Sequence, residues 1–199
     1  MKKIFFLPAL LLIGIVGQAQ KWAKEYTHVN ESFCGLSLVE KDGKHGYVNK
    51  DGKLIIPLIY DEGMNFTDGF AGVMIDNRWG FIDSTGKEIA KPQYGEVYSF
   101  NEGVAAVSKG NSWGFIDQKG TLVIPMNYTN ARCFSSGLAP VCNDKMQWGY
   151  INKEGKTIIP FQYSYADRFR EGTAKVMKSG KWSYIDPSGK MVMVNEGGE

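Results

Sequence analysis

The sequence is poor in the residues on which many enzymes and metal sites depend. Its 199 residues include two histidines, His28 and His45, and three cysteines, Cys34, Cys133 and Cys142. The histidines have no partner at the spacing of a zinc motif or a catalytic triad, and no glycine-rich phosphate loop occurs. The sequence therefore predicts a non-enzymatic protein with no catalytic residues, no metal site and no cofactor.

Neither sign of charge is in excess. The chain has 23 basic and 21 acidic residues, a formal net charge of +2, and no basic stripe of the kind that follows a phosphate backbone. These counts argue against a nucleic-acid partner. A hydrophobic fraction of 43% is ordinary for a folded protein and argues against wholesale disorder.

Long hydrophobic runs are missing except at the N-terminus. A basic start at residues 1–3 precedes an apolar run at 4–16 and the small-residue segment 17–19, which is the three-part layout of a secretory signal. The run is short for a membrane span of about 20 residues, which disfavours an uncleaved anchor. We expect a signal peptide over 1–19 and a mature chain that begins near Gln20. This chain would have equal numbers of acidic and basic residues and no transmembrane segment. Its predicted location is the periplasm, the cell envelope or the extracellular space.

Internal repetition is the dominant feature of the remaining sequence. A phenylalanine before a glycine-containing turn recurs every 33 to 35 residues, at Phe33, Phe66, Phe100, Phe134 and Phe169. A block of the form Trp-Gly-Phe/Tyr-Ile-Asp/Asn follows at 79–83, 113–117 and 148–152. The terminal copies at 45–49 and 182–186 diverge, with His45 in place of the tryptophan and Ser183 in place of the glycine. Divergent terminal copies are typical of repeat arrays.

These motifs resemble the WG-repeat family, also called KWG repeats, which is found in bacterial exported proteins. The resemblance covers about residues 24–194. It implies a repeat architecture and contributes no catalytic residues, because no common activity defines the family. We therefore expect one WG-repeat domain over 20–199, with units at about 24–65, 66–99, 100–133, 134–168 and 169–194.

The segments within each unit are typical of strands. Residues 103–107, 113–117 and 121–125 are short and rich in β-branched and aromatic types. Asp or Asn at the first position and Gly at the fourth predict a tight turn before the last strand, and a proline predicts the end of that strand. We expect an all-β fold of five tandem three-stranded antiparallel units of about 34 residues, forming an open, solenoid-like repeat array. A closed five-bladed, propeller-like ring is the alternative, although 34 residues are few for an ordinary blade.

The repeated tryptophans Trp79, Trp113, Trp148 and Trp182 have two interpretations. Exposed rings would stack on sugars or peptides, whereas an aromatic at a fixed place in every unit favours packing. The repeated Asp and Asn residues stand alone before turn glycines, so turn formation explains them better than calcium binding. Cys133 and Cys142 flank one turn and form either a disulfide or unpaired thiols.

The variable residues of the units lie at hairpin tips, at 76–78, 109–112, 143–147 and 178–181. Loops on one face commonly form the binding surface of repeat proteins. The leading hypothesis is thus an exported interaction or envelope scaffold module whose partner is a protein or a cell-envelope polymer. A glycan- or cell-wall-binding module is the first alternative, and an envelope enzyme or enzyme inhibitor is the second. The candidate binding residues are Arg78, Trp79, Trp113, Lys145, Trp148, Lys181 and Trp182.

Overall fold

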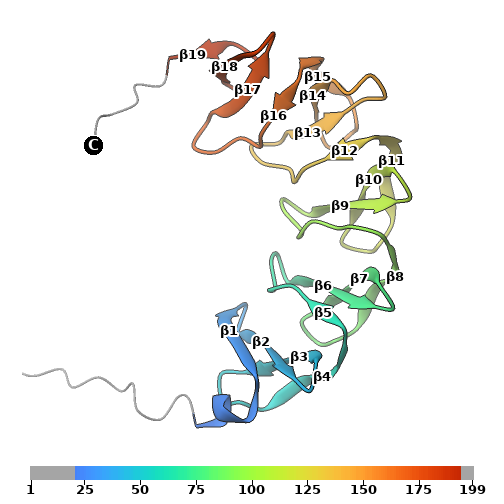
Figure 1. Cartoon of the computed structure of the whole chain (residues 1–199), viewed down its shortest axis with the longest axis vertical. Coiled ribbons are helices and arrows are strands. Elements are labelled where there is room, and N and C mark those ends of the chain that lie inside the picture. The colour runs from blue at the N-terminus through green and yellow to red at the C-terminus, as the bar shows by residue number, and fades with distance from the viewer. Residues whose placement is uncertain (1–20, 194–199) are drawn as a thin grey trace, which may run out of the picture.

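Five small antiparallel sheets follow one another along an open arc (Figure 1). The computed structural model describes residues 21–193, so the expected signal peptide over 1–19 lies outside the described residues. Within the described chain, a 3-10 helix at Trp22–Glu25 precedes the sheets and no α-helix occurs. The predicted all-β repeat array is confirmed, and the two ends of the arc lie well apart, in contrast to the ring of the alternative.

The strands of every sheet lie in the order of the sequence, and we call the first strand of a sheet the inner strand and the last one the outer strand. The first sheet has β1 (His28–Phe33), β2 (Leu36–Lys41), β3 (Lys44–Asn49) and β4 (Leu54–Tyr60). The second has β5 (Glu62–Gly63), β6 (Phe70–Ile75), β7 (Arg78–Asp83) and β8 (Glu88–Tyr94). The third has β9 (Val104–Lys109), β10 (Ser112–Asp117) and β11 (Leu122–Tyr128). The fourth has β12 (Asn130–Ala131), β13 (Ala139–Cys142), β14 (Trp148–Ile151) and β15 (Thr157–Tyr163). The fifth has β16 (Tyr165–Ala166), β17 (Ala174–Lys178), β18 (Lys181–Ile185) and β19 (Met191–Val192).

The structure adds an inner strand to the three that the sequence predicts for each unit. Three of these additions, β5, β12 and β16, are two residues long, and the third sheet has a single bridge between Val97 and Val107 at the same place. Segments this short carry no alternating pattern that could reveal them in the sequence. Each pairs with the strand that follows the repeated phenylalanine, so the residues just before that phenylalanine belong to the same sheet as the residues after it.

The outer strand continues through its proline, where the sequence analysis expected it to end. Pro57, Pro92, Pro125 and Pro160 lie inside β4, β8, β11 and β15. The register against the neighbouring strand shifts on either side of residue 115 in β10, which marks a bulge in β11. The outer strand is a sheet edge, and proline is tolerated at edges and bulges because no ladder bond there requires its missing N–H.

This bulge explains the glycine of the Trp-Gly pair. A Cβ atom added to Gly114 would lie 2.6 Å from the Ile124 carbonyl oxygen and 3.0 Å from the Met126 nitrogen. Gly46, Gly80 and Gly149 meet the same backbone obstacle. In the last unit the opposing strand β19 has only two residues, and Ser183 takes the glycine's place. The glycine is thus required by close approach of two backbones.

The predicted tight turns are confirmed. The Thr85 and Lys87 amides donate to Asp83 Oδ1 over 2.9 and 3.0 Å, and Gly86 has a φ of 87°. The hydrogen bonds from Thr85 lower the pKa of Asp83 from its ordinary range. Equivalent bonds occur at Asn49, Asp117, Asn152 and Asp186. These side chains are therefore occupied by turn formation.

Aromatic pairs fill the space between consecutive sheets. The aromatic residue after each Trp-Gly pair packs on the repeated phenylalanine of the next unit, with ring centroids 4.9 to 5.0 Å apart. The pairs are Tyr47–Phe66, Phe81–Phe100, Phe115–Phe134 and Tyr150–Phe169. All eight rings are buried. The core of the molecule therefore lies between neighbouring units, as the repeat pattern predicts.

Candidate functional site

The hairpin tips that the sequence singled out are exposed. Residues 76–78, 109–111, 144–147 and 178–181 are open to solvent, including Arg78, Lys145 and Lys181. These tips join equivalent strands in each sheet, so they recur at one place along the arc. They are available for contact with a partner, and few of their side chains take part in the core.

The repeated tryptophans differ in exposure from unit to unit. Trp113 and Trp148 are only 6% and 8% exposed, and Trp79 is half-buried. Trp182 of the last unit is 51% exposed, with the Lys175 ammonium 4.7 Å from its ring centroid. Sugar binding by a row of tryptophans requires several exposed rings. The described chain has one such ring, and packing accounts for the two buried ones.

The three cysteines are free, so the disulfide alternative is not realised. Cys142 is buried, Cys133 is half-buried and Cys34 is exposed. Of the two readings of Cys133 and Cys142, the structure supports unpaired thiols.

Two further properties concern only residues 21–193. No group of three or more His, Cys, Asp or Glu side chains in this range is placed to hold a metal ion. No helix in this range is long and apolar enough to cross a membrane.

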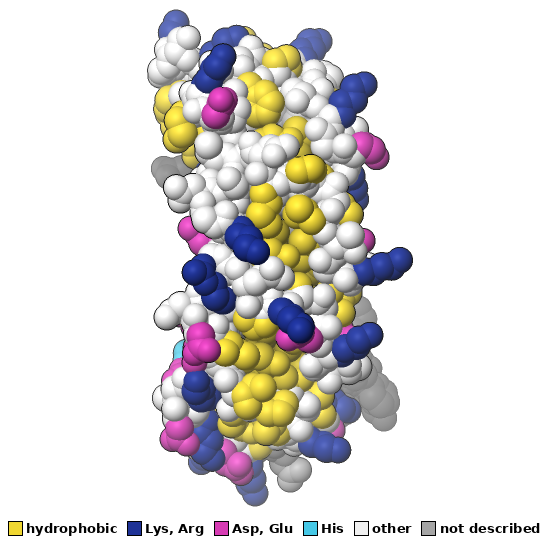
Figure 2. Space-filling view, turned by 90° about the vertical axis from the view of Figure 1, so that its right-hand side faces the viewer, with side chains coloured by type: hydrophobic (Ala, Val, Ile, Leu, Met, Phe, Trp, Pro, Cys, Tyr) yellow, Lys and Arg dark blue, Asp and Glu magenta, His cyan; other side chains and the backbone are white. Residues whose placement is uncertain are grey.

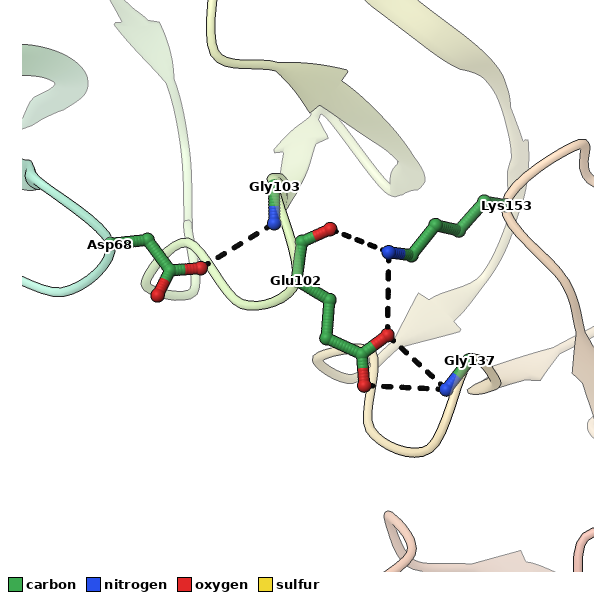
Figure 3. Close-up of polar contacts among 5 residues, drawn as sticks. All are labelled: Asp68, Glu102, Gly103, Gly137 and Lys153. Atoms are coloured by element: carbon green, nitrogen blue, oxygen red, sulfur yellow. Dashed lines mark hydrogen bonds and ion pairs between the residues drawn. The ribbon is translucent and has the colours of Figure 1, made fainter.

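Polar contacts link the turns of consecutive units (Figure 3). The Gly103 amide donates to Asp68 Oδ2 over 3.4 Å, and the Gly137 amide donates to both Glu102 carboxylate oxygens over 3.2 and 3.3 Å. The Lys153 ammonium donates to the Glu102 carbonyl oxygen over 2.7 Å and lies 3.4 Å from Oε2. These contacts therefore connect the turns of consecutive units.

The convex edge of the arc carries an apolar surface. Figure 2 views this edge and shows hydrophobic side chains gathered along its middle, with lysines and arginines beside them. Large exposed hydrophobic residues of the outer strands are Leu54, Ile55 and Ile59 of β4, Leu122 and Val123 of β11, and Ile158 of β15. The prolines within these strands oppose pairing with a foreign strand.

Arginines gather at a place where the sequence analysis put no candidate. A hollow of about 290 Å³ lies beside the short inner strands β12 and β16. Its lining consists of Tyr98, Arg132, Cys133, Asp167, Arg168 and Arg170. We call it the arginine hollow. It contains three of the four arginines of the chain, whereas no lysine within residues 21–193 lines it.

The arginine hollow could have been suspected from the aligned repeats. Arg132 lies two residues before its repeated phenylalanine, and Arg168 and Arg170 lie on either side of theirs. The corresponding residues of the second unit are Met64, Asn65 and Thr67, and those of the third are Tyr98, Ser99 and Asn101. The sequence analysis considered residues shared by all units and residues of the tips, so it did not consider arginines that occur near the repeated phenylalanine in only two units.

A family model described as "WG containing repeat" matches residues 46–79, 79–113, 113–146 and 148–182. These matches cover more than half of the chain, and their spacing agrees with the repeated glycines and aromatics described above. The chain therefore belongs to the WG-repeat family. No curated protein matches it.

Solved structures resemble the arc in fold at low sequence identity. A structure titled as the eukaryotic initiation factor superposes with a TM-score of 0.55 at 11% identity over 86% of this chain and 55% of its own. The computationally designed Ika8 protein superposes with a TM-score of 0.53 at 11% identity, over 83% of this chain and 60% of its own. Hsv2 of Kluyveromyces lactis superposes with a TM-score of 0.50 at 11% identity, over 80% of this chain and 59% of its own. The neighbours are β-propeller-like folds, and this chain spans between 55% and 60% of these three.

Proposed function

We propose that the protein is an exported, non-enzymatic interaction module that binds another protein through its exposed hairpin tips. The observation that carries the proposal is that the shared residues of each unit have structural roles, whereas the tips are exposed. The shared aromatics are buried between sheets, the shared Asp and Asn side chains form turns, and the shared glycines lie under a neighbouring backbone. The exposed tips vary in sequence from unit to unit.

Repeat arrays of this kind supply extended binding surfaces because each unit adds a similar loop at a regular interval. In rigid scaffolds, loops carry function while the repeated elements hold them in place. The tips at 76–78, 109–112, 143–147 and 178–181 fit this role, with a basic residue in each. A polymer of the cell envelope is an alternative partner, and Trp182 is the exposed aromatic that it would use.

The proposal is tested by photocrosslinking in intact cells, with a photoreactive residue placed at one tip at a time. We expect position 77, 111, 145 or 179 to crosslink a protein partner. Matched positions 54 and 122, exposed on the convex edge, serve as controls. Crosslinks that arise only from the control positions would contradict the proposal, and capture of carbohydrate alone would favour the envelope polymer.

Export is proposed from the N-terminal sequence, with a basic start, an apolar run and small residues before Gln20. Fractionation of the native host followed by N-terminal sequencing tests it. We expect the protein outside the cytoplasm with Gln20 as its first residue. An intact N-terminus in the cytoplasmic fraction would overturn this part of the proposal.

A further inference from the structure

The arginine hollow is built by three successive units, which contribute Tyr98, the pair Arg132 and Cys133, and the segment 167–170. The ion pairs among the described residues are Lys44–Asp61 and Lys153–Glu102, so none of the arginines in the hollow has an ion-pair partner there. Asp167 is the only acidic residue in the lining, and its Oδ1 accepts the backbone amide of Arg168 over 2.8 Å. The hollow therefore has an excess of positive charge.

Arg132 is held in place by aromatic rings. Its guanidinium carbon lies 5.3 Å from the ring centroid of Trp148 and 5.1 Å from that of Tyr165. Its Nε atom is buried and has no hydrogen-bond partner among residues 21–193. A buried donor without a partner is unfavourable in a folded protein. A guanidinium packed against rings in this way can bind a planar anion through two parallel N–H bonds.

We propose that the arginine hollow is a binding site for carboxylate groups, presented by the acidic side chains of a partner's peptide segment. Arg132 and Arg168 are half-buried, Arg170 is exposed, and all three provide donors to the bound group. Tyr98 offers a flat apolar wall for the methylene groups of a glutamate. The Asp167 carboxylate in the lining reduces the excess of positive charge and so lowers the advantage that a doubly charged phosphate would have over a singly charged carboxylate.

This site goes beyond the proposed function, since none of the hollow's lining residues is a hairpin-tip residue. The tip crosslinking can fail while the hollow still binds carboxylates, and the reverse holds as well. Separate measurements therefore test the two proposals.

Cys133 supplies a reporter inside the hollow. Burial raises the pKa of its thiol, while the nearby Arg168 acts in the opposite direction. Iodoacetate carries a carboxylate and iodoacetamide a neutral amide of nearly the same size. With either reagent the thiolate sulfur attacks the methylene carbon, an S–C bond forms and iodide leaves. The ratio of the two rates cancels the influence of thiol ionisation and isolates the preference for a carboxylate.

We expect the ratio of the iodoacetate rate to the iodoacetamide rate to be about tenfold higher at Cys133 than at the exposed Cys34. This is the gain typical of one charge-assisted hydrogen bond. Mass spectrometry of the cysteine peptides measures both sites in one sample. R168Q and R170Q should lower the ratio at Cys133 toward that of Cys34, and R168K should restore it only in part. R78Q, which removes the remaining arginine at a hairpin tip, should leave it unchanged. Equal ratios at the two cysteines would overturn the proposal.

A peptide arm identifies the kind of ligand. Oligo-glutamate should slow the reaction of Cys133 with iodoacetamide several-fold and leave Cys34 unaffected, whereas oligo-glutamine should protect neither. Protection by oligo-glutamate that survives in an R132Q/R168Q/R170Q variant with an unchanged circular dichroism spectrum would contradict the assignment. Protection by inorganic phosphate but not by oligo-glutamate would replace the carboxylate site with a phosphate site.

Discussion

At the scale of the residue, two of the repeated residues are explained by what surrounds them. The glycine of the Trp-Gly pair lies directly under the bulge of the outer strand, and the aromatic residue after it fills the space below the next unit. Tyr47 and Tyr150 also donate a hydrogen bond to a carbonyl of that next unit, over 2.7 and 2.8 Å. Phe81 and Phe115 occupy the same place without this bond.

Gly114→Ala should lower the free energy of unfolding by about 1–3 kcal/mol, the range for inserting atoms into a filled space. The added methyl group would press on the Ile124 carbonyl and the Met126 amide, which are backbone groups that move only with the strand. Urea unfolding followed by circular dichroism measures the change. Ser183→Ala at the equivalent place in the last unit is the control, with an expected effect below about 0.5 kcal/mol. A larger loss in the control than in Gly114→Ala would refute this account of the glycine.

Alkaline pH should destabilise the protein through its buried tyrosines. Burial is the main cause that raises the pKa of Tyr47 and Tyr150 above the ordinary value near 10.0. The unfolded chain ionises first, so their contribution is intact below pH 10 and stability falls as pH rises above it. Tyr150→Phe should reduce that fall and cost about 1 kcal/mol at neutral pH through the lost bond to Asp167. The test is urea unfolding at neutral and alkaline pH, and an unchanged alkaline slope would be the contrary result.

At the scale of the element, the boundary between two units is the main source of stability. Each boundary joins an aromatic pair, and three of the turns in Figure 3 are tied by carboxylates to backbone amides or a lysine. A single four-stranded sheet buries little surface by itself. Each sheet therefore depends on its neighbours, which is the behaviour expected of a repeat array.

Phe100→Ala and Phe33→Ala form a matched pair at the same repeat position. Phe100 is fully buried against Phe81, whereas Phe33 in the first unit is 41% exposed. We expect a loss of about 3–5 kcal/mol for Phe100→Ala, as for other buried phenylalanines, and a much smaller loss for Phe33→Ala. Thermal unfolding of the two variants ranks them. Similar losses of stability in the two variants would show that packing between units is not the main source of stability.

The elements that could be predicted from sequence are those with a strong local signal. Asp83 and Gly86 predict their turn from the sequence alone. The repeated aromatics likewise predict the long strands and the core. The two-residue strand β5 and the continuation of β11 through Pro125 were not predictable, because each depends on a neighbouring strand. The arginine hollow combines Arg132 with Arg168, which are 36 positions apart, so only the packing of units brings them together.

At the scale of the whole molecule, the arc resembles part of a propeller-like fold without its closure. The arginine hollow lies next to β12 and β16, the convex edge is apolar (Figure 2), and the hairpin tips are exposed. Each surface is present in a single chain and requires no ring to form.

Small-angle X-ray scattering of the purified mature chain tests the open shape. We expect a pair-distance distribution that matches the arc of Figure 1 and extends beyond that of a closed ring with the same number of residues. The profile should stay constant over a dilution series if the arc is the shape of one molecule. A compact, ring-like distribution at all concentrations would be incompatible with the open array.

The open ends of the arc also bear on how such a protein can change over generations. A ring must accommodate a fixed number of blades, since the last one has to meet the first. An arc has no such seam, so a duplication or deletion of one 34-residue unit alters its length and leaves every remaining boundary intact. Gene rearrangement can therefore change the length of the surface that contacts a partner, one unit at a time.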